Sequence, residues 1–109
     1  MLAQRLRHRI TIARLETSDD GDEASQESWP VLVDQLPAEV VALSGREFVG
    51  AAAVQAQVDT RITIRRRADL KPHDRIEHEG NFYDIRAILP DPSLRRHMTL
   101  MCQSGVNGG

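Results

Sequence analysis

The chain has few of the residues on which catalytic and base-stacking sites depend. It contains one cysteine and four aromatic side chains, Trp29, Phe48, Phe82 and Tyr83. One cysteine excludes an intramolecular disulfide, and so few aromatics argue against a platform on which the bases of single-stranded nucleic acid stack. No stretch approaches the ~18 apolar residues of a membrane span, and no apolar segment of a secretory signal follows the basic start. We therefore expect a protein without a membrane partner, made in the cytoplasm as a single domain of the usual ~100–150 residues.

The net charge of −2 conceals three segments of different sign. Residues 1–15 contain four arginines and no acid, whereas residues 16–45 contain eight acids and no base. Residues 46–109 contain ten bases and eight acids. A chain with this asymmetry can present surfaces of opposite sign to different partners.

Alternation of apolar and polar residues predicts that most of the chain forms β-strands. The predicted strands with their inward side chains are 8–14 with Ile10 and Ile12, 58–67 with Ile62 and Ile64, and 96–102 with Met98, Leu100 and Cys102. Residues 29–43 are predicted to form one long bent strand or two short ones, with Pro37 at an edge or a bend.

Residues 75–89 predict a β-hairpin, because Gly80 and Asn81 separate two alternating runs and favour a two-residue turn. That turn would pair Glu79 with Phe82 and Ile76 with Ile85. The side chains then expected on the core side are Ile76, His78, Tyr83, Ile85, Ala87 and Leu89.

Two further segments complete the predicted fold. Residues 16–28 contain no large apolar side chain, which is typical of a long acidic loop. Ser44 and Glu47 have capping-box spacing ahead of an alanine-rich run, which predicts a helix near 46–57. The fold class is therefore mainly β, a small antiparallel β-barrel of about six strands with one helix. Residues 1–103 are taken as the domain and 104–109 as a flexible tail.

The sequence offers little for chemistry. Its histidines, at positions 8, 73, 78 and 97, share no close spacing, and no second cysteine is available for a zinc site. His78 is expected to be a hydrogen-bonded core residue rather than a ligand. We predict no catalytic residue, no cofactor and no metal, and hence no enzyme.

Two charged features remain, each with two interpretations. Arg65, Arg66 and Arg67 end a predicted strand and either contact phosphates or an acidic partner, or keep the strand end soluble. The loop 16–28 is either held open by its own repulsion or serves to repel DNA, which is useful where DNA must pass without sticking.

Several short motifs occur in an order that resembles a known family. These are Arg5 to Ile12 followed by an acidic loop and Glu27-Ser28-Trp29, then Leu43 to Phe48, Ala51 to Val58, Thr60 to Arg65, Arg75-Ile76, Gly80, Tyr83-Asp84-Ile85 and Arg95 to Cys102. Together they resemble the head–tail joining proteins of tailed phages, also called head-closure or head–tail adaptor proteins, of the SPP1 stopper type. The resemblance covers roughly residues 5–103 and implies a barrel with a long loop between its first two strands.

The resemblance also implies a structural role in a virion of phage, prophage or gene transfer agent origin. Subunits of such proteins form a ring, dodecameric in the assembled connector, that extends or closes the DNA channel below the portal and offers a docking surface to the tail. The implied partners are other copies of the chain, portal or adaptor ring proteins, tail proteins, and double-stranded DNA that passes without sequence-specific binding.

For that role we hypothesise two groups of site residues. The candidate channel or partner loop comprises Glu16, Asp19, Asp20, Asp22, Glu23 and Glu27. The candidate subunit interface comprises Arg5, Arg7, Arg9, Arg46, Glu47, Arg65, Arg66 and Arg67. The alternative is a small-barrel nucleic-acid-binding or regulatory adaptor module, which would need exposed aromatics beside basic residues on one face; Phe82 near Arg86 is the one outward candidate.

Overall fold

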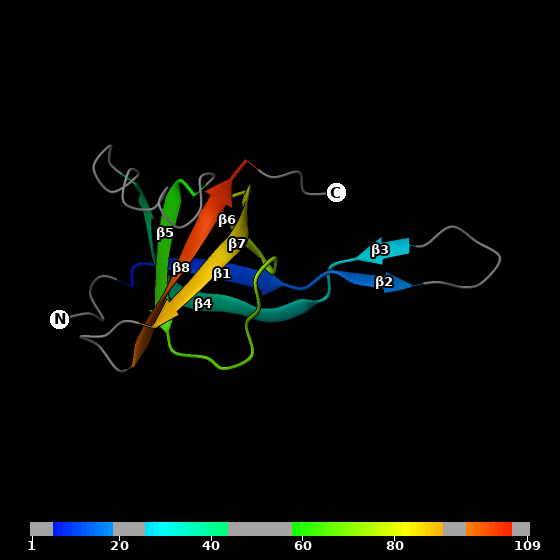
Figure 1. The fold of residues 1–109 in the computed structure, drawn as a ribbon, viewed down its shortest axis with the longest axis horizontal. Coiled ribbons are helices and arrows are strands. Elements are labelled where there is room, and N and C mark those ends of the chain that lie inside the picture. Colours follow the sequence, from blue (N-terminus) through cyan, green and yellow to red (C-terminus); the bar gives the residue numbers. More distant parts are fainter. Residues whose placement is uncertain (1–5, 19–25, 44–57, 91–95, 106–109) are drawn as a thin grey trace.

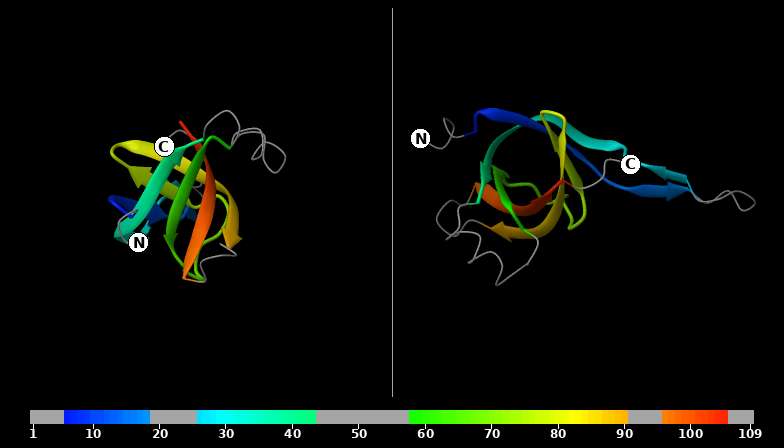
Figure 2. Two further views of the ribbon diagram at one scale, coloured as in Figure 1. Left: turned by 90° about the vertical axis from the view of Figure 1, so that its left-hand side faces the viewer. Right: turned by 90° about the horizontal axis from the view of Figure 1, so that it is seen from above.

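The computed structural model describes residues 6–18, 26–43, 58–90 and 96–105, and these form a closed antiparallel β-barrel with a projecting two-stranded ribbon (Figure 1). The strands are β1 (His8–Ala13), β2 (Glu16–Ser18), β3 (Gln26–Ser28), β4 (Val31–Ala42), β5 (Thr60–Arg65), β6 (Arg75–His78), β7 (Asn81–Pro90) and β8 (His97–Ser104). The barrel order is β1-β4-β5-β8-β7-β6, and β6 pairs with β1 to close it (Figure 2). The predicted mainly β class and the six-stranded barrel are confirmed. The helix expected near 46–57 lies outside the described residues.

The core is made by the alternation that the sequence displays. Side chains with almost no exposed area come from β1, β5, β6, β7 and β8 and meet inside the barrel: Ile10, Ile12, Ile62, Ile64, Ile76, Ile85, Leu100 and Cys102. Met98 joins this cluster, so the inward residues predicted for β1, β5 and β8 are correct. β8 continues to Ser104, one residue into the segment that the sequence assigned to the tail.

The β6–β7 hairpin differs from the prediction in its turn. His78 pairs with Asn81 and Ile76 with Tyr83, so the two turn residues are Glu79 and Gly80 rather than Gly80 and Asn81. Both have positive φ, 51° and 80°, as a type I′ turn requires. The register moves by two residues, which preserves the faces, and Ile76, His78, Tyr83 and Ile85 are buried as expected.

The prediction that Ala87 and Leu89 of β7 lie on the core side is wrong because of a β-bulge. The β7–β8 register shifts between Ile85 and Ala87. A bulge adds one residue to a strand and exchanges its faces beyond that point. Ile88 therefore packs on the core, whereas Leu89 is 40% exposed.

β4 is one continuous bent strand that passes through Pro37. Its register against β1 shifts twice. Ile10 pairs with Leu36, Ile12 with Val33 and Ala13 with Val31, and a shift lies between each of these pairs and the next. Extra residues on one strand increase its twist and bend it. Pro37 lies one residue before the start of the β4–β5 pairing at Ala38, where its missing N–H interrupts no bond to β5.

Candidate assembly surfaces

The acidic segment 16–28 is the outstanding feature of the molecular shape, because its two ends form a ribbon that projects from the barrel (Figure 1). Glu16 pairs with Ser28 and Thr17 with Glu27. The predicted loop is therefore β-structure at both ends. The ribbon prolongs the β1–β4 ladder, since the Arg14 N–H donates to the Pro30 carbonyl between the two. Glu16 and Glu27 are exposed on it, and residues 19–25, with the other four acids of the predicted loop, lie outside the described residues.

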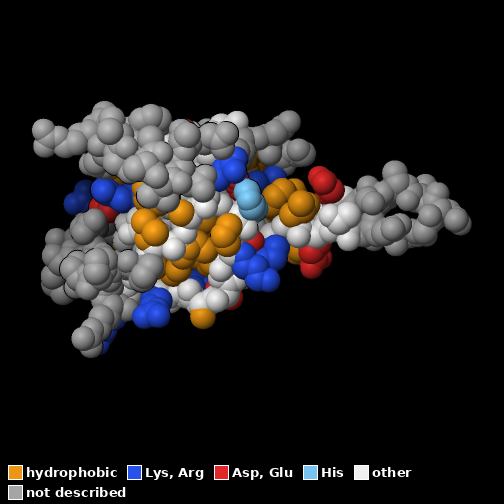
Figure 3. Space-filling model, viewed as in Figure 1, with side chains coloured by type: hydrophobic (Ala, Val, Ile, Leu, Met, Phe, Trp, Pro, Cys, Tyr) orange, Lys and Arg blue, Asp and Glu red, His pale blue; other side chains and the backbone are white. Residues whose placement is uncertain are grey.

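Hydrophobic side chains gather where the ribbon leaves the barrel, beside acidic ones (Figure 3). Val31 is 58% exposed and Leu15 is 40% exposed at this base. Next to them the Arg75 guanidinium lies between two rings, with its Cζ 4.0 Å from the centroid of Trp29 and 4.5 Å from that of Phe82. Such cation–π contacts contribute about 0.5–1 kcal/mol each at exposed sites. We call Leu15, Trp29, Val31, Arg75 and Phe82 the ribbon base.

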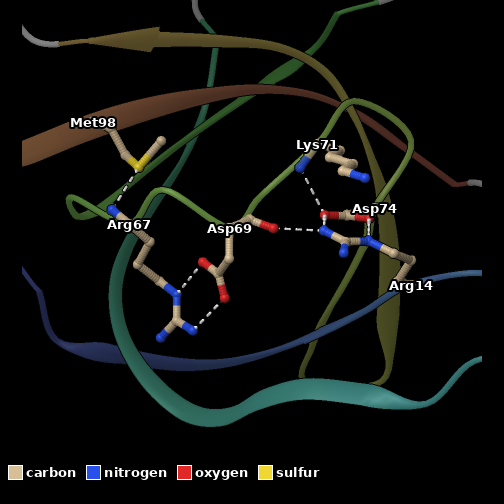
Figure 4. A network of polar contacts seen from close by, with 6 residues as sticks. All are labelled: Arg14, Arg67, Asp69, Lys71, Asp74 and Met98. Carbon is tan, nitrogen blue, oxygen red and sulfur yellow. Dashed lines mark hydrogen bonds and ion pairs between the residues drawn. The ribbon is translucent and has the colours of Figure 1, made fainter.

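An ion pair fastens the strand that leads into the ribbon. The Arg14 guanidinium donates from Nε to Asp74 Oδ1 at 2.9 Å and from Nη2 to Asp74 Oδ2 at 3.0 Å, and it also bonds the Asp69 carbonyl (Figure 4). Asp74 is buried, and its Oδ2 also accepts the Lys71 N–H at 2.8 Å. The carboxylate beside it raises the pKa of Arg14, chiefly through the hydrogen bond, so the guanidinium keeps its charge at every working pH.

The loop between β5 and β6 is held by a second pair. Arg67 donates to both carboxylate oxygens of Asp69, at 3.0 and 2.8 Å, and its N–H donates to the Met98 sulfur (Figure 4). The hydrogen bond from Arg67 lowers the pKa of Asp69. Of the three arginines predicted as a partner site, Arg67 is therefore engaged within the chain.

Arg65 and Arg66 remain exposed at the end of β5, and the structure adds a third arginine to them. Arg65 pairs with His97, and the Arg66 N–H donates to the carbonyl of exposed Arg96, which brings the start of β8 beside the end of β5. We call Arg65, Arg66 and Arg96 the basic group. Sequence reasoning missed Arg96 because only the β5–β8 register places it there.

The other predicted interface residues divide between described and undescribed segments. Arg9 in β1 and Arg7 just before it are exposed. Arg5, Arg46 and Glu47 lie outside the described residues.

The barrel also brings together two histidines that the sequence separates widely. His8 at the start of β1 and His78 at the end of β6 have ring centroids 4.7 Å apart, with the rings nearly perpendicular. Glu79, in the hairpin turn, has a carboxylate oxygen 3.8 Å from His78 Nε2. Sequence spacing gave no signal of this group, because its members meet only through the β1–β6 pairing.

None of the described residues belongs to a helix with the length and apolar character needed to cross a membrane.

Comparison with known proteins identifies this small barrel with its projecting acidic ribbon. The model of the phage head completion protein family matches residues 1–105. The chain is 37% identical over 107 residues to head completion protein gp7 of Enterobacteria phage HK97, with 94% of this chain and 95% of the relative covered. The solution structure of protein SF1141 from Shigella flexneri 2a is also similar, with a TM-score of 0.80, 31% identity and coverage of 98% of this chain and 99% of that one. The chain belongs to the phage head completion protein family, which confirms the resemblance to head-closure proteins.

Proposed function

We propose that this protein is a structural subunit of a phage or prophage virion that forms a ring in the head–tail connector. In this proposal the ring extends or closes the DNA channel below the portal and offers the surface on which the tail docks. The observation that carries it is family membership over nearly the whole chain, joined to a barrel without a free edge strand. In the described part of the chain the closed barrel offers no strand for edge-to-edge pairing, which favours contacts between copies through side chains and the projecting ribbon.

Ring contacts in this proposal join the acidic ribbon of one subunit to the basic group of the next. A ring requires a heterologous interface, in which one patch meets a different patch on the neighbour. Exposed Glu16 and Glu27 offer negative charge on the ribbon, while Arg65, Arg66 and Arg96 offer positive charge at the end of β5. The exposed Leu15 and Val31 at the ribbon base supply apolar area beside the charges. In the same proposal the acidic segment 16–28 points toward the channel or a neighbouring ring.

The experiment adds the purified chain to heads of the parent phage or prophage that lack it, and images the connector by electron microscopy. We expect a ring of added density below the portal. The variant with Glu16→Lys and Glu27→Lys should lose it, and so should the variant with Arg65→Glu and Arg66→Glu. Combining all four changes in one chain restores complementary charge and should restore the ring. Glu77→Lys is the matched control, since Glu77 is an exposed acid of β6 outside the ribbon.

Absence of any added ring would refute the connector role itself. A ring that forms equally well with every charge variant would instead refute the ribbon-to-arginine contact and leave the role standing. Because exposed charge pairs are screened by salt, added salt should weaken the wild-type ring, with a marked loss between ~0.1 and 1 M.

The alternative of a nucleic-acid-binding module is less well supported by the ribbon base. Trp29 and Phe82 do lie beside a basic residue, as such a module needs, but Arg75 covers a ring face of each. We propose that the isolated subunit does not bind duplex DNA tightly. A salt-sensitive fluorescence anisotropy change with submicromolar affinity at moderate salt would favour the alternative and assign the basic group to phosphates.

A further inference from the structure

His8, His78 and Glu79 meet where the start of β1 lies near the end of β6 and the β6–β7 turn. His8 lies on the inward face of β1 with Ile10 and Ile12, and His78 lies on the inward face of β6 with Ile76. The last recorded β1–β6 pair is Thr11 with Glu77, so both histidines lie just beyond the point where the ladder ends. The nearby turn adds the Glu79 carboxylate.

We infer that these three side chains bind a divalent transition-metal ion of the zinc type. Each offers one donor atom, and the three donors lie within 4.8 Å of one another. In a tetrahedral zinc site, with Zn–N and Zn–O distances near ~2.0–2.2 Å, ligand atoms stand about 3.4 Å apart. Two imidazoles and a carboxylate are ligands that zinc accepts, and they leave a fourth position open to water.

The fit needs only small movements of the more exposed ligands. The Glu79 side chain is 74% exposed and His8 is half-buried, so both can rotate toward the ion without displacing core residues. His78 is the fixed member, with a side chain that is only 9% exposed.

Two features of the geometry hold the donors of this group together. The His78 side chain is buried, and its Nε2 lies 3.8 Å from a carboxylate oxygen of Glu79. The Glu79 carboxylate comes from the two-residue turn that follows His78 directly, so the hairpin itself places these two donors side by side.

A bound ion would fasten the start of β1 to the β6–β7 turn, at a point where no recorded strand pairing joins them. This role needs no catalysis and is independent of the proposed place of the protein in a virion.

The test uses the full chain without an affinity tag, treated with chelator and then dialysed, and titrated with Zn²⁺ in a calorimeter. We expect one saturable site per chain with a Kd of about 10 μM or tighter, and a rise in Tm with Zn²⁺. In NMR spectra the ring protons of His8 and His78 should shift on addition of Zn²⁺, while those of His73 and His97 should not.

Substitutions at the exposed ligands avoid unfolding the core. His8→Gln and Glu79→Gln should each weaken Zn²⁺ binding by at least about 10-fold, a loss typical of disturbed metal sites. His73→Gln is the matched control, because His73 is 70% exposed and contacts the Asp84 carboxylate at 3.2 Å.

Three results would overturn the inference: no saturable binding below ~1 mM Zn²⁺, wild-type affinity in His8→Gln, or loss of binding in His73→Gln. The last would move the ion to His73 and Asp84.

Discussion

At the scale of single residues, burial makes the one thiol of the chain, Cys102, unreactive. Cys102 is fully buried, and its Sγ lies 3.5 Å from the Leu100 carbonyl. Desolvation raises the pKa of the Cys102 thiol, and since the thiolate is the reactive form, the native residue should be inert. We predict that Ellman's reagent modifies native protein at pH 8 at least about 100-fold more slowly than protein unfolded in urea. Equal rates would show that β8 opens readily.

The raised pKa of Cys102 also makes the free energy of unfolding change with pH in the alkaline range. Folding raises the pKa values of Cys102 and of Tyr83, in both cases chiefly by desolvation. Above the ordinary thiol pKa of ~8.5 the native state therefore holds more protons than the unfolded state, so the free energy of unfolding falls as pH rises. The contribution of the Cys102 thiol to the free energy of unfolding is fully present below about pH 8.5 and is lost as the pH rises above it. Urea midpoints at pH 7, 9 and 10.5 should decline, and Cys102→Ala should decline less over the same range.

Residue burial could be predicted where it depends on alternation within one strand. Ile10, Ile12 and Leu100 were assigned correctly because neighbouring side chains in a strand point to opposite faces. Pairs such as Arg14 with Asp74, or His8 with His78, could not be predicted, because each joins segments at least 60 residues apart through the register of the barrel.

At the scale of elements, the β6–β7 turn permits a test of backbone strain. Glu79 and Gly80 both have positive φ, and a Cβ built at Gly80 meets nothing within 4 Å. In metal-free buffer Glu79→Asn should stabilise the protein by about 0.5–1 kcal/mol, since Asn tolerates this conformation better. Gly80→Ala should destabilise it by about 1 kcal/mol through backbone conformation alone.

Chemical unfolding of the two turn variants beside wild type measures both effects. Destabilisation by Glu79→Asn would mean that the Glu79 side chain contributes through its approach to His78 rather than straining the turn.

The hairpin also shows what limits prediction of elements. Glycine can occupy either place in a two-residue turn, so the local sequence does not distinguish Glu79-Gly80 from Gly80-Asn81. The pairing of Ile76 with Ile12 of β1 and with Tyr83 of β7 fixes the register. The ribbon escaped prediction for a related reason: its strands have no apolar alternation and form because they continue the β1–β4 ladder.

At the scale of the whole molecule, the barrel and the ribbon should be separable. The β1–β4 ladder is already closed at its end by the pairing of Ala13 with Val31 and by the bond from the Arg14 N–H to the Pro30 carbonyl. The Arg14–Asp74 pair holds this end from the barrel side. A variant in which Asn-Gly replaces residues 16–28 should therefore keep the barrel, because a two-residue turn suits strands that pair at this point.

In the proposed connector the consequence for assembly is different, since the deletion removes Glu16 and Glu27 together with the rest of the ribbon. We predict that the shortened chain keeps slow amide exchange at core residues such as Ile62 and Leu100, and adds no ring to heads that lack the protein. Glu77→Lys, with the ribbon intact, controls for surface charge change. A shortened chain that still forms the ring would assign the subunit contacts to the barrel surface, whereas one that unfolds would show that the ribbon is part of the folding unit.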